Sequence, residues 1–185
     1  MITFKYLVRT IAGFVIVVLL GGADLPPEHI TLSLTSGTNI AASLSPDAKI
    51  IIFELQGTLW QIDIEGGKAR ALTDPLSDSR QPQWSPDGKQ IAFQSFQDGN
   101  WHIWLLNRDG SDLRRLTNGP QDDREPFWHP SGKRIVFSSD RSGNYDLWSI
   151  ELSDAEMKQL TDDPSNEHSP TWSPDSSRLA FISDR

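Results

Sequence analysis

The sequence has no cysteine and, beyond residues 11–20, no long apolar run, and each absence excludes a class of protein. Without cysteine there is neither a disulfide framework nor a lipidated cysteine at a processed N-terminus. No later stretch approaches the roughly 20 apolar residues that span a bilayer. A sustained helical apolar period is missing as well, so short strands and turns are expected to build the fold.

Basic residues are also scarce, with 17 Lys and Arg against 25 Asp and Glu and a net charge of −8. A surface of this sign repels phosphate backbones, which argues against nucleic acid as a partner. Common catalytic and ligand-binding motifs are missing from the sequence: there is no nucleophile elbow, no His-Glu-x-x-His and no Gly-rich phosphate loop. The four His residues are scattered, and the acidic pairs lack the order of a calcium loop. We therefore expect no catalytic set, no metal and no cofactor in this chain.

Residues 1–23 have the pattern of an export signal. Lys5 and Arg9 form a basic start, Ile11 to Leu20 an apolar core, and Gly21 to Ala23 a small-residue cleavage site. An uncleaved anchor is the alternative, although the core is short for a spanning helix. The pattern predicts a periplasmic or secreted protein with no stable membrane insertion once the signal is removed.

What the sequence does contain is one unit repeated at an interval of 44 residues. Trp84, Trp128 and Trp172 keep this interval, and a second series with the same spacing consists of Trp60, Trp104 and Trp148. Each copy also carries a Ser-Pro-Asp-Gly-like turn, a Phe, and, where the copy is long enough, a Leu-Thr pair. Repeats of this length indicate propellers, solenoids or arrays.

Each unit is predicted to form four short antiparallel strands, because its apolar runs are too short for helices and are bounded by turn residues. Four such strands per repeat describe an all-β propeller blade. We place blades at residues 37–73, 74–117 and 118–161, and half a blade at 162–185. Residues 24–36 hold a strand-like stretch, His29 to Thr35, that could close the ring. Propellers usually have roughly 4 to 8 blades, so we expect an N-terminal fragment of a longer protein.

The Ser-Pro-Asp-Gly stretch is interpreted as a corner of the fold. Pro presets the backbone for a type I turn, Ser and Asp bond nearby backbone groups, and Gly closes the turn. A catalytic residue need occur only once, whereas this stretch recurs wherever a strand must reverse. The two tryptophan series are expected to pack between stacked blades, where each indole removes about 150 to 250 Å² from water.

With these motifs in place, the chain resembles the TolB-type propeller repeats, which are WD-like blades marked by Trp-Ser-Pro-Asp-Gly-Lys-x-Ile-Ala-Phe and a terminal Leu-Thr. The resemblance covers nearly all of residues 37–185. Residues 37–73 are also similar to the opening blade of propellers fused in front of amidohydrolase domains. The first resemblance implies a periplasmic binding role, and the second implies a hydrolase domain elsewhere in a parent protein.

One set of polar residues is a candidate binding site. Arg80, Arg124 and His168 share one repeat position at the entry to the predicted innermost strand, so they should ring the mouth of the central channel, with Asp123 and Glu167 beside them. The alternative is a set of ordinary surface ion pairs.

Two main functions remain open at this stage. The first is an exported, non-catalytic propeller that binds a protein or peptide. The second is the propeller of a hydrolase, amidohydrolase-like or prolyl-oligopeptidase-like, with its catalytic domain beyond Arg185. A carbohydrate-binding propeller, with sugars stacked on Trp101 and Tyr145, is a third hypothesis.

Overall fold

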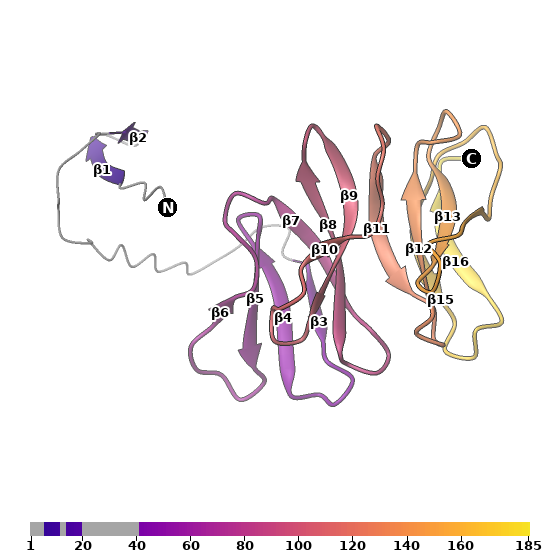
Figure 1. The fold of residues 1–185 in the computed structure, drawn as a ribbon, viewed down its shortest axis with the longest axis horizontal. Helices are drawn as coiled ribbons and strands as arrows, with labels where there is room; N and C mark the ends of the chain where they lie inside the picture. Colours follow the sequence, from indigo (N-terminus) through magenta and orange to yellow (C-terminus); the bar gives the residue numbers. More distant parts are fainter. Residues whose placement is uncertain (1–5, 12–13, 20–40) are drawn as a thin grey trace. The chain divides into compact units, whose positions relative to one another are not determined.

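The computed structural model describes residues 6–11, 14–19 and 41–185, and the described residues form strands and turns without a helix (Figure 1). The chain divides into two units, Met1–Ser36 and Gly37–Arg185. In the first, β1 (Tyr6–Ile11) and β2 (Phe14–Leu19) pair as an antiparallel hairpin. The expected cleavage site and ring-closing strand lie outside the described residues, and the export signal stays a prediction. No described segment forms a helix of the length and apolarity needed to cross a bilayer.

The second unit consists of separate antiparallel sheets whose strands pair in chain order, as predicted for propeller blades. The first sheet contains β3 (Ala42–Leu44), β4 (Ile50–Leu55), β5 (Thr58–Asp63) and β6 (Arg70–Ala71). The second contains β7 (Ser79–Trp84), β8 (Gln90–Gln97), β9 (Asn100–Asn107) and β10 (Arg114–Arg115). The third contains β11 (Asp123–Trp128), β12 (Arg134–Ser139), β13 (Asp146–Glu151) and β14 (Met157–Gln159). The last pairs β15 (Glu167–Trp172) with β16 (Leu179–Ser183). We call these sheets blades 1 to 4; they do not close a ring.

The recurring Ser-Pro-Asp-Gly stretch is a corner in all copies, between the first and second strand of each blade. In blade 2 the Ser85 hydroxyl donates to the Asp87 carboxylate at 2.7 Å, and the Gly88 N–H donates to the Ser85 carbonyl at 2.9 Å. The fourth residue takes a left-handed backbone in every copy, with φ of 68° at Gly88 and 62° at Ser176. Ser176 therefore adopts a conformation that favours glycine.

The other repeated residues make contacts between strands of the same blade. The Phe of the second strand faces the Trp of the third strand in register, as Phe93 faces Trp104 and Phe137 faces Trp148. The Leu-Thr pair directly follows the fourth strand, and its threonine hydroxyl accepts the N–H of a third-strand residue, as in the 3.0 Å contact from Ile103 to Thr117. These contacts explain why both motifs recur at fixed places.

Blades stack through their first strands, because β3 contacts β7, β7 contacts β11, and β11 contacts β15. Two apolar cores lie between successive blades, one between blades 1 and 2 and one between blades 2 and 3. Trp84 and Trp128 belong to these cores, and each indole N–H donates at 3.2 Å to a backbone carbonyl of the preceding blade. The first strand is therefore the innermost, as expected.

Full burial between blades holds for only two of the six repeated tryptophans. Trp84 and Trp128 are buried, whereas the other four rings, at Trp60, Trp104, Trp148 and Trp172, are half-buried. The third-strand tryptophans instead cover the Phe of their own sheet, and Arg141 lies over Trp148 at 5.1 Å. Their role is thus partly within a blade and only partly between blades.

Candidate functional site

The three residues predicted at the channel mouth occupy equivalent places in the structure. Arg80, Arg124 and His168 lie near the start of the innermost strands β7, β11 and β15. Each is the last regularly paired residue before a register shift in its strand. The next residue has a left-handed backbone in all three blades, with φ of 53°, 55° and 52° for Gln81, Glu125 and Ser169. Such a bulge changes the direction of the neighbouring side chain, so all three side chains are placed alike.

Aromatic rings from the start of β9 and from the β12–β13 connection lie beside these residues. The guanidinium carbons of Arg80 and Arg124 both lie 5.3 Å from the centre of the Trp101 ring. Arg124 also lies 5.8 Å from the Tyr145 ring, and the Tyr145 and His168 ring centres are 5.2 Å apart. The five side chains form a continuous series of cationic and aromatic groups across blades 2, 3 and 4. We call them the mouth cluster.

Two carboxylates orient the arginines of the mouth cluster. Asp78 accepts from the Arg80 Nε at 2.8 Å, and this bond raises the pKa of Arg80 above its usual range. The Asp122 carboxylate accepts a hydrogen bond from the Arg124 Nη2 at 2.7 Å and another from the backbone N–H of Trp101 at 2.9 Å. Burial acts to raise the pKa of Asp122, but the Trp101 N–H and the Arg124 guanidinium outweigh it and hold that pKa below the usual range. Each arginine is therefore held in a defined orientation by a carboxylate of its own blade.

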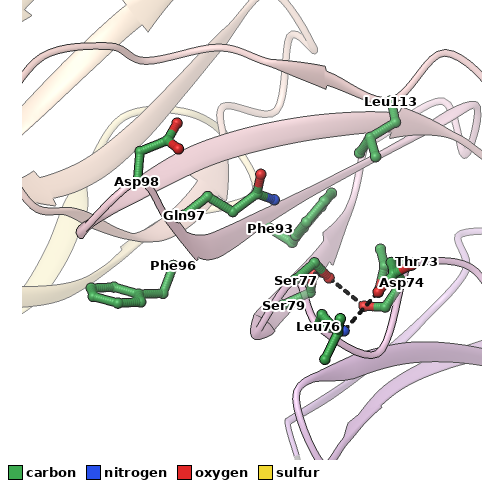
Figure 2. A pocket seen from close by; sticks show the side chains of 10 residues that line it. All are labelled: Thr73, Asp74, Leu76, Ser77, Ser79, Phe93, Phe96, Gln97, Asp98 and Leu113. Atoms are coloured by element: carbon green, nitrogen blue, oxygen red, sulfur yellow. Dashed lines mark hydrogen bonds between the residues drawn. The ribbon is translucent and has the colours of Figure 1, made fainter. Parts of the chain in front are cut away.

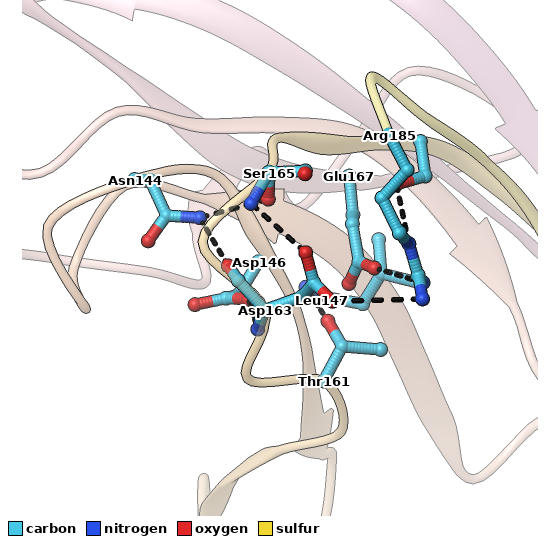
Figure 3. A network of polar contacts seen from close by, with 9 residues as sticks. Asn144, Asp146, Leu147, Thr161, Asp163, Ser165, Glu167 and Arg185 are labelled. Carbon is cyan, nitrogen blue, oxygen red and sulfur yellow. Dashed lines mark hydrogen bonds and ion pairs between the residues drawn. The ribbon is translucent and has the colours of Figure 1, made fainter.

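Asp123 and Glu167, which were predicted beside the mouth residues, directly precede Arg124 and His168 in β11 and β15. Both are fully buried. Asp123 pairs with Arg141 at 2.5 Å, and Glu167 pairs with Arg185 at 3.0 Å, in a network that includes Asp163 (Figure 3). A buried charge needs a partner, and the same pair recurs 44 residues later. In blades 3 and 4, each of these carboxylates therefore joins the start of the first strand to the end of the second, away from solvent.

Two residues at the inner edge escaped the sequence reasoning. The Gln94 side-chain oxygen accepts the N–H of Glu125 at 2.6 Å, and the Glu125 carboxylate accepts the N–H of Ser169 at 2.5 Å. Each bond joins a blade to the bulge of the next one. A proline recurs at 44-residue spacing after these bulge residues, at Pro82, Pro126 and Pro170, and would have marked the bulge. No repeat pattern in the sequence marks Gln94, because the residue at the equivalent position of blade 3 is a serine.

The aromatic members of the mouth cluster, Trp101 and Tyr145, are the residues that the sequence offers for stacking on sugar rings. Guanidinium and imidazole groups of neighbouring residues contact these rings, so a smaller part of each ring face is accessible to a sugar. Trp101 and Tyr145 stand 44 residues apart, each just after a Gly-Asn turn. That spacing would have placed an aromatic ring at the same position in blades 2 and 3, but not its contact with the next blade. Across the described residues, no three His, Asp or Glu side chains converge on a common point where a metal could bind.

Comparison with known proteins places this geometry in context. Residues 41–145 match the family model of the Tricorn protease N-terminal beta propeller domain, and residues 125–185 match that of the TolB beta propeller domain. The chain is 27% identical over 104 residues to dipeptidyl-peptidase 5 of Porphyromonas gingivalis, a match that covers 46% of this chain and 15% of that protein.

Solved structures give the same result. TolB from Acinetobacter baumannii is 26% identical, with a TM-score of 0.66 over 77% of this chain and 37% of its own. A puromycin-hydrolyzing peptidase from Mycobacterium tuberculosis shares the fold at 16% identity, with a TM-score of 0.61 over 77% of this chain and 27% of its own. The chain thus spans only a part of each relative. With more than half of its length matched by one family model, the chain belongs to the Tricorn protease N-terminal beta propeller family, and its repeats are of the TolB type.

Proposed function

We propose that this chain is a non-catalytic propeller of an exported protein and that it binds a protein or peptide partner at the mouth cluster. The observation that carries the proposal is the continuous series of Arg80, Trp101, Arg124, Tyr145 and His168 at the inner edge. Trp, Tyr and Arg are the residues that most often dominate binding energy at protein interfaces.

The geometry supports binding because the cluster is both accessible and ordered. The Arg80 and Arg124 side chains are 48% and 38% exposed, and each is held by its own carboxylate. A partner would therefore immobilise few side chains on binding, which reduces the entropic cost of association. Such a site suits a polar or acidic peptide group that can share the guanidinium N–H donors.

A second candidate is the propeller of a peptidase. The match to the Tricorn propeller model and the likeness to dipeptidyl-peptidase 5 support it. In that case the mouth cluster would contact peptide substrates on their way to a catalytic domain. A fusion to an amidohydrolase domain remains a prediction from the first blade.

A photo-crosslinking amino acid placed at Tyr145 tests the binding proposal in the full-length protein. We expect a single specific adduct, identified by mass spectrometry, that is reduced at least fivefold by Arg124→Ala. Lys133→Ala, at the opposite end of blade 3, is the matched control and should leave the adduct intact. Equal labelling from position 145 and from the distant Ile64 would contradict the proposal.

The reading frame beyond Arg185 separates the two candidates. Further Ser-Pro-Asp-Gly units followed by an end favour a binding propeller alone. A hydrolase domain after the remaining blades favours the second candidate.

A further inference from the structure

A hollow of about 620 Å³ lies on blade 2, between the β6–β7 loop and the β8–β9 hairpin (Figure 2). Three large apolar side chains in its lining are open to solvent: Leu76 is 86% exposed, Leu113 50% and Phe96 42%. Single exposed apolar residues are common, but a group of them around one hollow marks an interaction site. We call this hollow the Leu76 pocket.

The loop that presents Leu76 is ordered by its own hydrogen bonds. The Asp74 carboxylate accepts the Leu76 N–H at 2.8 Å, and the Asp74 carbonyl accepts the Ser77 hydroxyl at 2.6 Å and the Ser77 N–H at 3.0 Å. The exposure of Leu76 is thus built into a defined turn. A preordered apolar wall lowers the entropic cost of binding.

Polar groups in the floor of the pocket are already engaged. The Thr73 hydroxyl accepts the Leu59 N–H at 3.0 Å, and the Ser77 and Ser79 hydroxyls are bonded to each other at 2.7 Å. Phe93, also in the lining, is 1% exposed. Because these hydroxyls already have partners within the protein, the floor favours an apolar side chain over a polar one as its occupant.

The charges in the lining are all negative. Asp74 and Asp98 are its charged members. The Asp98 side chain is 82% exposed and lies 3.3 Å from Arg115. Within residues 41–185, no basic group stands within ion-pairing distance of Asp74. A cationic group beside the apolar occupant would therefore be attracted to this rim.

We propose that the Leu76 pocket docks a short peptide segment of a partner in which a bulky apolar side chain stands next to Lys or Arg. Apolar walls, an internally satisfied floor and an acidic rim together specify this chemistry. The pocket adjoins the mouth cluster, since the Phe96 and Trp101 ring centres are 5.5 Å apart. The inference does not depend on the mouth cluster, because it uses other residues.

Fluorescence anisotropy with the full chain tests the proposal. The probe is a labelled peptide with the central sequence Ser-Leu-Phe-Lys-Arg-Ser. We expect the double substitution Leu76→Ser/Leu113→Ser to weaken its Kd about tenfold through lost apolar burial. Asp74→Asn/Asp98→Asn should weaken it about threefold, and by less at high salt. Ile64→Ser removes an apolar side chain that is 48% exposed elsewhere, and should change nothing.

Three results would overturn the inference. One is an unchanged Kd in the Leu76→Ser/Leu113→Ser variant, with an unchanged melting temperature. Another is equal binding of a peptide in which Glu replaces Lys and Arg. The last is concentration-dependent dimerisation that this variant abolishes, because the occupant would then be a second copy of the chain. Arg124→Ala should leave this Kd unaltered, so a failure here is distinguishable from a failure of the mouth-cluster proposal.

Discussion

The same phenylalanine has three different environments in the four blades. Phe93 and Phe137 are 1% and 0% exposed, Phe53 is half-buried, and Phe181 is 36% exposed. Phe93 and Phe137 have both a cross-strand Trp in their own sheet and a preceding blade against them. Phe53 has its Trp but no preceding blade among the described sheets, and Phe181 has a preceding blade but no third strand. Burial of this position therefore requires both neighbours.

Glu167, in contrast, is buried although its blade is incomplete in this structure. Blade 4 has only two strands in this structure, yet Glu167 is as fully buried as its blade 3 counterpart Asp123. Its N–H donates to the Tyr145 carbonyl of blade 3 at 2.7 Å, and its carboxylate pairs with Arg185 of its own hairpin. The inner edge is completed by the first two strands and the preceding blade, whereas the sheet faces need the outer strands too.

The largest difference in stability between blades is expected when the first-strand tryptophan is replaced. Trp128→Ala should lower the free energy of unfolding by about 3 to 5 kcal/mol, because it empties a buried site and removes the bond to Gln83. Trp172→Ala, at the half-buried equivalent position, should cost about 1 to 2 kcal/mol. Urea denaturation measures both. Equal losses would show that burial in the structure does not govern the contribution of this position.

The next largest loss of stability is expected when the buried ion pair of blade 3 is broken. Asp123→Asn leaves the Arg141 guanidinium, which is only 14% exposed, without its counter-charge. We expect a loss of about 2 to 3 kcal/mol in the free energy of unfolding, below the usual figure for a broken buried pair because Asn still accepts one hydrogen bond. Glu167→Gln should cost less, since Arg185 is 57% exposed. The reverse order would contradict the assigned environments.

A milder substitution examines the phenylalanine directly. Phe137→Leu should destabilise the protein by about 1 to 2 kcal/mol by leaving a small cavity. Phe181→Leu should stay within about 0.5 kcal/mol of the parent, as for other exposed positions. Thermal melting of the two variants side by side is sufficient. A loss at Phe181 as large as that at Phe137 would mean that a further surface covers blade 4 in solution.

The smallest effect concerns the turns, in which the main contact of the Asp carboxylate is with the Ser of the same turn. The hydroxyls of Ser45 and Ser173 are the main cause that holds the pKa of Asp47 and of Asp175 at about 2, below the ordinary 3.8. Since the folded pKa is depressed, the stabilisation is present above about pH 4 and is lost as the pH falls towards 2. NMR titration should show the Asp47 pKa rising in Ser45→Ala, with Asp175 unchanged. An unmoved Asp47 pKa would contradict the local origin.

Much of the fold was predictable because its signals are local. The 44-residue spacing, the Ser-Pro-Asp-Gly turns and the short apolar runs specify strands that pair with their sequence neighbours, and these pairings appear in chain order. The candidate site was only partly predictable. Arg80, Arg124 and His168 shared a repeat position, but the contacts of Arg124 with Trp101 and of His168 with Tyr145 cross blades and needed coordinates.

The sequence by itself determined the blade, because each turn, strand and Leu-Thr closure depends on residues within one repeat. Only the tertiary structure decided which repeated side chains are buried, which carboxylates are neutralised by a buried arginine, and where exposed apolar groups gather around a hollow. The physical reason is that burial and electrostatic environment depend on the adjacent sheet and on the loops between sheets. A residue's position in its own repeat does not specify them.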